Sequence, residues 1–334
     1  MTLIAYTDKY LEHDNINHPE NSERLVSIMR VLKRSGIMKE VKLVEPKPCD
    51  ENIILEVHSE EMVNKVKELS ETTGWIDLDT YVCIGSYEIA RLAVGAVLDL
   101  AETILSGEDE TGFALVRPPG HHATRNRSMG FCLFNNVAIT AHLLAKKKKK
   151  ILIFDHDVHH GNGTQDIFYE DPRVMYQSFH LSPHYPGTGD IDEVGRGDGE
   201  GYTINLPLPR GAGRDTVIEA MRKVFIPIAE RFKPDLIIVS AGFDSHYQDP
   251  LGGLRLDIDT FYQMIDLLRS VQRRLVCSLE GGYNLDKLGI LVLTEIRAMM
   301  NLDRPIEERI DELSHAGDRI EKLKRRMREY WDIG

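Results

Sequence analysis

The chain has 334 residues, 42% hydrophobic and 28% charged, a composition typical of a globular protein that buries a substantial core. Its formal net charge of −12 argues against nucleic acid as a partner, because phosphate backbones bind basic surfaces, and is better matched to cationic substrates. Four scattered cysteines without a CxxC pair argue against a disulfide framework and a thiolate zinc site. The lack of a signal peptide or of an apolar run of roughly 18 residues predicts a cytoplasmic protein without membrane contact.

The first third of the chain predicts short strands and amphipathic helices. Ser22 is the expected N-cap of a helix that ends at Gly36, and a second helical pattern, from about residue 51 to 69, breaks near His58. The strongest helix pattern covers residues 86–105, where small and apolar residues form a continuous stripe. Short strands are expected at 3–6 and 41–44, and a loop without periodicity at 74–80.

From residue 113 onward, predicted strands alternate with predicted helices, which is typical of an α/β fold with a mostly parallel sheet. The strands are expected at 113–116, 151–154, 174–178, 202–206, 236–240 and 275–278, and the main helices at 135–147, 215–232, 259–271 and 285–300. A last, highly charged helix is expected over 306–331, packed on the outside of a core that spans about residues 1–300. Because no repeat or linker divides the chain, we expect one catalytic domain of residues 1–334.

The segment ILIFDHDVHHGNG, residues 151–163, joins an apolar strand to a cluster of metal-binding side chains. Asp155, Asp157, His159 and His160 follow the strand within six positions. Carboxylate and imidazole are the usual ligands of catalytic zinc, so we interpret Asp157 and His159 as two ligands and expect a third from another strand. A polar turn is the alternative explanation.

Parallel sheets build their sites at the carboxyl ends of the strands, so the other strand ends are the places to find the third ligand. Asp244 follows a hydrophobic strand and Gly242, which lets the backbone approach closely, and we predict it as that ligand. An aspartate of this kind, taken alone, is more often a turn or helix cap. Three protein ligands leave one zinc position open for water, as a hydrolytic metal requires.

Two more strand ends supply a histidine pair and a tyrosine. His121 and His122 are predicted to act in acid–base and electrostatic roles if a further group fixes each ring, and Asp155 and Asn162 are the expected partners, one charged and one neutral. Adjacent surface histidines are the alternative. Tyr283 follows two glycines that would let its phenol reach a developing oxyanion, although an ordinary half-buried tyrosine has the same pattern.

Taken together and in order, these motifs resemble the zinc-dependent histone deacetylase family, which includes acetylpolyamine amidohydrolases and acetoin utilisation proteins. The motifs are RPPGHHA, GFCLFNN, FDHDVHHGNGTQ, PGTGD, SAGFDS, DPLGG and LEGGYN. Asn162 and the HPE and ERL elements near His18 and Arg24 resemble the class II branch and its bacterial and archaeal relatives. The resemblance implies a three-layer, arginase-like α-β-α fold with the active site at the C-terminal ends of the strands.

The resemblance also implies an enzyme that hydrolyses the amide of an N-acetylated amine, either acetyl-lysine in a protein or an acetylated small molecule. The metal would be zinc, with Fe²⁺ as the alternative in the cell, on the ligands already predicted, Asp157, His159 and Asp244. In the family's roles, His122 activates the attacking water and then protonates the leaving amine, while His121 beside Asp155 acts electrostatically. Tyr283 would hydrogen-bond the acetyl oxygen.

Other matched positions imply a structural potassium site and a substrate channel. The potassium ion would bind Asp155, Asp157, His159, Ser178 and Phe179, partly through backbone oxygens. The channel would be lined by Gly130, Phe131, Tyr185 and Leu251, with Thr80 reaching the substrate backbone at the mouth. Tyr185 stands where phenylalanine is more common in the family, which adds a hydroxyl at the rim.

Three alternatives stay open at the level of sequence. An acetylpolyamine amidohydrolase would apply the same chemistry to a more highly charged amine, but relatives with that preference carry a glutamate where this chain has Leu251. A ureohydrolase with two manganese ions would need more bridging aspartates than DVHH offers. From a different class, the chain would bind acetyl groups without catalysis. The oligomeric state is open as well.

Overall fold

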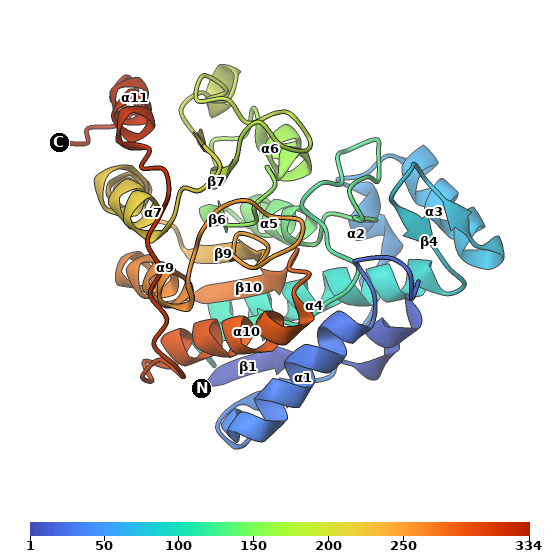
Figure 1. Ribbon diagram of the computed structural model, residues 1–334. Helices are drawn as coiled ribbons and strands as arrows, with labels where there is room; N and C mark the ends of the chain where they lie inside the picture. Colours follow the sequence, from blue (N-terminus) through green and yellow to red (C-terminus); the bar gives the residue numbers. More distant parts are fainter.

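An eight-stranded sheet forms the centre of the computed structural model, which describes residues 1–334 (Figure 1). Its strands are β1 (Thr2–Ala5), β2 (Lys42–Val44), β5 (Thr111–Ala114), β6 (Ile151–Asp155), β7 (Val174–Leu181), β8 (Thr203–Leu208), β9 (Leu236–Ala241) and β10 (Leu275–Leu279). Their spatial order is β2-β1-β5-β10-β9-β6-β7-β8, and every neighbouring pair is parallel. The predicted α/β class with a mostly parallel sheet is therefore confirmed.

The central strands are mostly apolar and buried along their whole length because helices cover both faces of the sheet. Every residue of β5, β6, β9 and β10 is buried. The register aligns Phe154 with Val239, Val239 with Cys277, and Cys277 with Phe113, so the four strands end almost level. These are the four strands whose ends carry the reactive motifs, and the sheet order makes them neighbours.

Helices form a layer on each side of the sheet (Figure 1). The α-helices are α1 (Glu23–Ser35), α2 (Glu51–Leu55), α3 (Glu60–Thr72), α4 (Ser86–Ser106), α5 (Asn136–Lys146), α6 (Asn162–Phe168), α7 (Arg214–Ala220), α8 (Ile226–Phe232), α9 (Ile258–Val271), α10 (Leu285–Met299) and α11 (Gly317–Met327). Helices α4 and α5 pack on one face, and α10 packs between α1 and α9 on the other. The main hydrophobic core, a cluster of 83 buried residues, includes side chains from both layers.

The predicted helix over 306–331 is wrong in its first half. Residues 303–316, which we call the C-terminal strap, form no helix, and α11 begins only at Gly317. Two strap glutamates bind backbone N–H groups at the start of other helices, Glu308 that of Ile258 and Glu312 that of Thr216, and these contacts replace local helix formation. Helix α11 packs on β8, at the edge of the sheet.

Three smaller features differ from the predicted pattern. The helix expected over 215–232 is split by a π-helical turn, η4 (Met221–Phe225), next to Pro227, which has no N–H for a helical bond. Residues 74–82 contain a hairpin, β3 (Gly74–Trp75) and β4 (Tyr81–Val82). Ser22 occupies the N-cap position of α1 without a side-chain capping bond. Short 3-10 turns complete the fold: η1 (Asp8–Glu12), η2 (Ile37–Lys39) and η3 (Gly197–Gly199).

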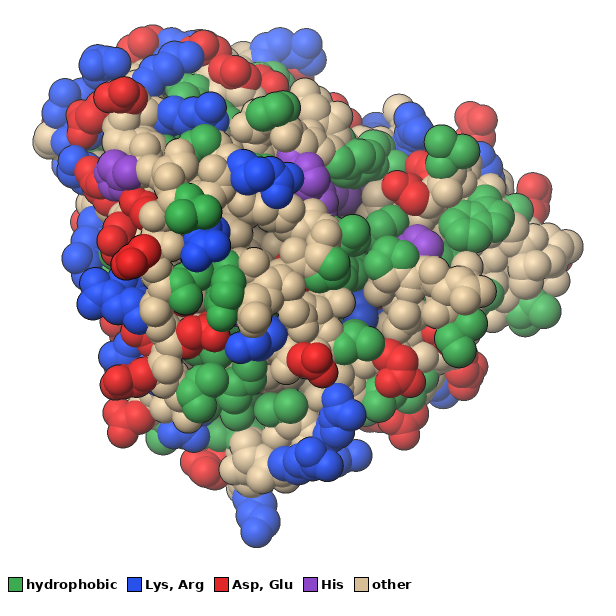
Figure 2. All heavy atoms as spheres, viewed as in Figure 1, with side chains coloured by type: hydrophobic (Ala, Val, Ile, Leu, Met, Phe, Trp, Pro, Cys, Tyr) green, Lys and Arg blue, Asp and Glu red, His purple; other side chains and the backbone are tan.

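On the face shown in Figure 2, acidic and basic side chains are intermixed. None of the helices combines the length and the apolar character that crossing a membrane requires. All four cysteines are free thiols.

Candidate active site

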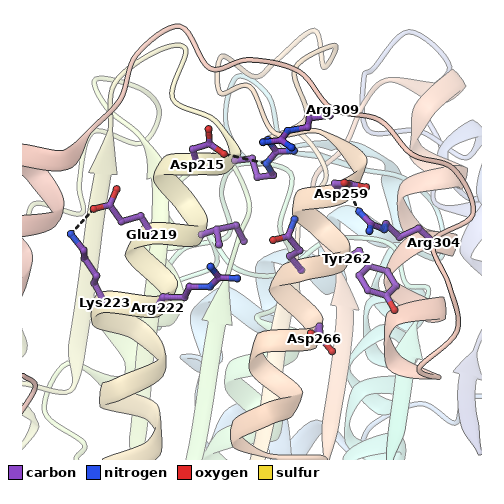
Figure 3. A pocket seen from close by; sticks show the side chains of 12 residues that line it. Asp215, Glu219, Arg222, Lys223, Asp259, Tyr262, Asp266, Arg304 and Arg309 are labelled. Carbon is purple, nitrogen blue, oxygen red and sulfur yellow. Dashed lines mark hydrogen bonds and ion pairs between the residues drawn. The ribbon is translucent and has the colours of Figure 1, made fainter.

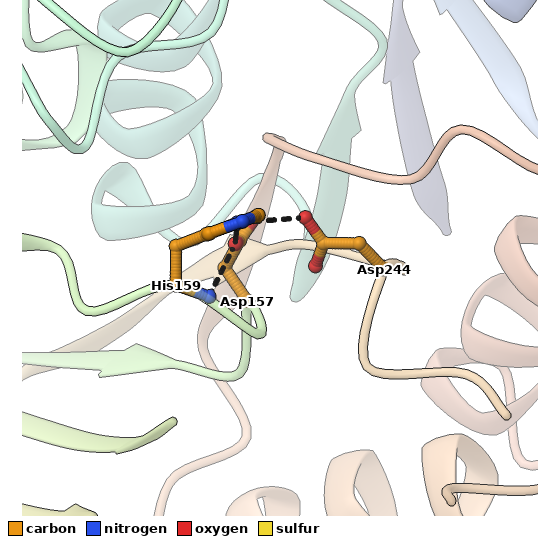
Figure 4. A group of neighbouring side chains, drawn as sticks. All are labelled: Asp157, His159 and Asp244. Atoms are coloured by element: carbon orange, nitrogen blue, oxygen red, sulfur yellow. Dashed lines mark hydrogen bonds and ion pairs between the residues drawn. The ribbon is translucent and has the colours of Figure 1, made fainter. Parts of the chain in front are cut away.

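The turns after β6 and β9 bring the three predicted metal ligands together. Asp157 and His159 come from the first turn and Asp244 from the second, and their side chains point toward one another (Figure 4). The ligand atoms all lie within 4.8 Å of one another, and His159 Nδ1 is 3.0 Å from Asp157 Oδ1 and 3.2 Å from Asp244 Oδ2. The N–H of Val158 donates to Asp244 Oδ1 at 2.8 Å, so the backbone of one turn fixes the carboxylate of the other.

The surroundings of the three side chains suit a divalent cation. Asp244 Oδ2 is buried and accepts no hydrogen bond, which is costly unless a positive charge lies nearby. Burial and the charge of Asp157 raise the pKa of Asp244 to about 7, and a dication would relieve that repulsion. Gly281 makes room for the group, because a Cβ there would lie 2.1 Å from Asp244 Oδ2. Two carboxylates and one imidazole form a donor set typical of catalytic zinc.

The two adjacent histidines have the partners that the sequence predicted. His121 Nδ1 lies 3.0 Å from Asp155 Oδ2, and His122 Nδ1 lies 2.8 Å from Asn162 Oδ1. Burial opposes the charged form of His121, but the carboxylates of Asp155 and Asp157 outweigh it and raise the pKa of its imidazole to about 10. Burial and the positive charge of His121 hold the pKa of His122 well below its ordinary value. The pKa values of these two adjacent rings are therefore shifted in opposite directions.

Two buried residues that the sequence analysis left without a role hold this arrangement in place. Tyr176 OH donates to Asp155 Oδ2 at 3.1 Å and accepts from the N–H of Gly161. Glu280 Oε2 accepts from the N–H groups of Gly120, at 2.7 Å, and His121. Glu280 is visible in the sequence as the only charged residue of LEGGYN, but its partner lies 160 residues away, so only the fold reveals the contact.

A narrow cavity of about 200 Å³ leads to the cluster. Its lining includes both histidines and four of the five residues predicted to contact substrate: Asp79, Pro119, His121, His122, Gly130, Phe131, His159, His184, Tyr185, Leu251, Gly281 and Tyr283. Gly130 adopts φ +56°, and a Cβ at this position would lie 2.5 Å from the His122 ring. The rings of Phe131 and Tyr283 meet edge to face, with centroids 5.8 Å apart. Aromatic side chains from separate loops thus enclose the path to the metal ligands.

Thr80 is the predicted substrate contact that does not line the cavity. Its side chain is fully buried, and its hydroxyl accepts from the N–H of Phe131 at 3.2 Å and donates to Asp79. Asp79 lines the cavity instead. In this short hairpin a shift of one residue reverses which side chain faces the cavity, and the sequence there has no periodicity that would fix the register.

Two further features at and near the turn after β6 are the surroundings of His160 and the predicted potassium site. His160 lies away from the metal ligands, with Nδ1 at 2.7 Å from Thr188 Oγ1 and Nε2 at 3.0 Å from Gln165 Oε1. Asp155 is paired in register with Ser178, and Phe179 follows Ser178 on β7, so three of the five residues predicted for potassium lie on adjacent strands. Asp157 and His159 lie in the turn that follows β6. The potassium site stays a prediction.

Comparisons with known proteins match this chain to one protein family. The family described as Histone deacetylase domain matches residues 18–299. A "Probable deacetylase" of Archaeoglobus fulgidus is 38% identical, with 99% of each chain aligned, and "Histone deacetylase 10, chloroplastic" of Oryza sativa is 38% identical over 89% of this chain and 73% of its own length. The crystal structure of the HDA15 HD domain superposes with a TM-score of 0.92 at 35% identity, covering 99% of this chain and 96% of that one.

Proposed function

Because this chain belongs to the histone deacetylase family and is a deacetylase, we propose that it uses zinc to hydrolyse acetyl-lysine or another singly charged acetylated amine. The observation that carries this proposal is the convergence of Asp157, His159 and Asp244 at the inner end of a narrow cavity that His122 and Tyr283 also line.

The metal and the two adjacent histidines would have different roles at the acetyl group. Zinc held by the three ligands would supply Lewis-acid activation of water and of the acetyl carbonyl. The amide oxygen of Asn162 accepts a hydrogen bond from the Nδ1–H group of His122, which leaves Nε2 of that ring as the basic atom. His122 would take the proton of the attacking water there and return it to the leaving amine. His121, beside the charged Asp155, would act electrostatically.

Tyr283 is proposed to donate a hydrogen bond from its phenolic O–H to the acetyl oxygen as negative charge develops. Its backbone is held firmly, because Asp249 Oδ2 accepts from the N–H groups of Tyr283 at 2.6 Å and Asn284 at 3.1 Å. Tyr283 and His159 both line the cavity. A fixed donor at this position costs no reorganisation during the reaction.

The walls of the cavity favour a long apolar chain with one amine. Phe131 and Tyr185 line it, as expected for residues that contact methylene groups, and Leu251 lies at the position where a carboxylate would serve a polyamine. A second ammonium group beside Leu251 would find only an apolar side chain at that position, with no carboxylate to offset its desolvation there. The substrate we propose is therefore acetyl-lysine rather than an acetylated polyamine.

A comparison of two substrates tests this proposal. With zinc-reconstituted enzyme, we expect kcat/KM for an acetyl-lysine peptide to exceed that for N8-acetylspermidine. The matched variant Leu251→Glu places a carboxylate at the wall and should move the ratio toward the polyamine. A wild-type preference of tenfold or more for N8-acetylspermidine would overturn the assignment of substrate.

A further inference from the structure

The C-terminal strap, residues 303–316, lies outside the matched family domain, which ends at residue 299. Figure 1 shows it as the red segment that leaves α10, passes α9 and α7, and continues into α11. Along this path one strap side chain, Glu308, contacts the loops that carry part of the active site.

Glu308 binds four groups from three separate segments. Its Oε2 lies 3.1 Å from His246 Nε2 and 3.3 Å from the N–H of Ile258, at the start of α9. Its Oε1 accepts from Tyr247 OH at 3.3 Å and from Lys287 Nζ at 3.1 Å. The Glu308 side chain is only 15% exposed, so these contacts are largely shielded from water.

Two of these segments adjoin residues of the proposed active site. His246 and Tyr247 lie in the loop that begins at the metal ligand Asp244. The same loop carries Asp249, whose carboxylate holds the backbone of Tyr283. Lys287 belongs to the first turn of α10, four residues after Tyr283.

We propose that Glu308 is a positioning residue that fixes Asp244 and Tyr283 relative to each other. One carboxylate joins the loop of the metal ligand to the start of the helix that follows the phenol. It adds to the contact of Asp249 with the backbone of Tyr283, so its loss would loosen the two segments relative to each other. This inference rests on the proposed function for the role of Tyr283, and on geometry alone for the placement of Asp244.

Other strap contacts supply matched controls because they touch no active-site loop. Glu312 Oε2 accepts from the N–H groups of Gly213 at 3.0 Å and Thr216 at 3.1 Å, at the start of α7. Arg304 pairs with Asp259 at the edge of a charged surface cleft of about 710 Å³ between α7 and α9 (Figure 3). Removing either contact loosens the strap without removing a bond to the loop of Asp244.

The experiment compares Glu308→Ala and the milder Glu308→Gln with Glu312→Ala. Competition with a chelator should show zinc affinity about tenfold weaker in Glu308→Ala, the lower end for outer partners of metal ligands, and an intermediate loss in Glu308→Gln. On an acetyl-lysine peptide, kcat should fall about tenfold while KM stays within twofold, because Phe131 and Tyr185 lie on loops that the strap does not hold. Glu312→Ala should lower the melting temperature and leave zinc affinity and kcat within twofold.

Equal zinc affinity and kcat in wild type and Glu308→Ala would overturn the inference, and if that variant fails to fold, the same result in Glu308→Gln would do so. A zinc-loaded wild type without deacetylase activity would refute the proposed function instead. In that case the change of zinc affinity would still decide whether Glu308 positions Asp244.

Discussion

His121 and His122 are neighbours in the chain, yet their surroundings give them different chemistry. A carboxylate, Asp155, faces one ring and a neutral amide, Asn162, faces the other. The two partners flank the turn that carries Asp157, because Asp155 is the last residue of β6 and Asn162 is the first residue of α6. One short segment therefore carries a proposed metal ligand and the partners that set the protonation preferences of both rings.

Tyr283 provides the sharpest test at the scale of single residues. Tyr283→Phe removes only the phenolic hydrogen-bond donor, so kcat on an acetyl-lysine peptide should fall about a hundredfold, as for other single oxyanion donors. Zinc affinity should stay unchanged because the phenol is not a ligand. Steady-state kinetics and chelator competition measure the two effects, and a loss of kcat below about tenfold would contradict the role.

The side chains at strand ends could be predicted from sequence because an apolar strand fixes where its last residue lies. Asp157, His159 and Asp244 followed from this rule, and so did the partners of the two histidines. Contacts that depend on loop register or on distant segments could not be predicted. Asp79 replaces Thr80 at the cavity for the first reason, and the contact of Glu280 with the turn before His121 was missed for the second.

At the scale of elements, the strand order does most to build the site. Strands β5, β10, β9 and β6 are neighbours in the sheet although they are separated in the chain, so their four polar ends meet at one edge. Alternation of strands and helices predicted the parallel class, but it does not specify this order. The helical pattern of residues 306–316 was misleading because its glutamates bind the starts of α9 and α7 instead.

Helix α11 contributes to stability from a place away from the site. Ile320, Leu323 and Met327 are fully buried on one face of it, against β8 and η4. Leu323→Ala should lower the free energy of unfolding by about 3 kcal/mol through lost burial and the cavity it leaves. Denaturant titration measures this loss, and kcat of the folded variant should match the wild type.

The exposed Lys322 of the same helix offers the control. Lys322→Ala should change the free energy of unfolding by no more than about 0.5 kcal/mol. If Leu323→Ala were no more destabilising than Lys322→Ala, the packing of α11 on the sheet would be contradicted.

At the scale of the whole molecule, buried Glu20 links segments that are far apart in the chain. Its carboxylate accepts from Arg117 at 2.5 and 2.8 Å and from Arg24 at 3.0 Å, and Arg24 also donates to Gly282 O at 2.8 Å, next to Tyr283. Burial alone would raise the pKa of Glu20, but the two guanidinium charges outweigh it and lower the pKa from 4.5 to about 2. Burial also disfavours the charged form of nearby His13, and this lowers the pKa of its imidazole from 6.5 to about 3.

This network predicts a loss of stability in acid. A carboxyl group with a lowered pKa in the folded state stabilises it fully above the unfolded pKa, so the contribution of Glu20 should disappear as the pH falls from about 4.5 to 2. Glu20→Gln leaves two buried arginine charges and should cost about 3 kcal/mol at pH 7. Denaturant titrations of both proteins across this range test the claim, and a difference that stays constant down to pH 2.5 would contradict it.

The most direct test of the whole account is to titrate zinc into metal-free enzyme while measuring the acetate released from an acetyl-lysine peptide. We predict that turnover is absent without metal and rises to a plateau at one zinc per chain, and that Asp244→Ala abolishes both tight zinc binding and turnover. A plateau at two tightly bound ions per chain, or zinc binding without acetate release, would contradict a single-zinc deacetylase.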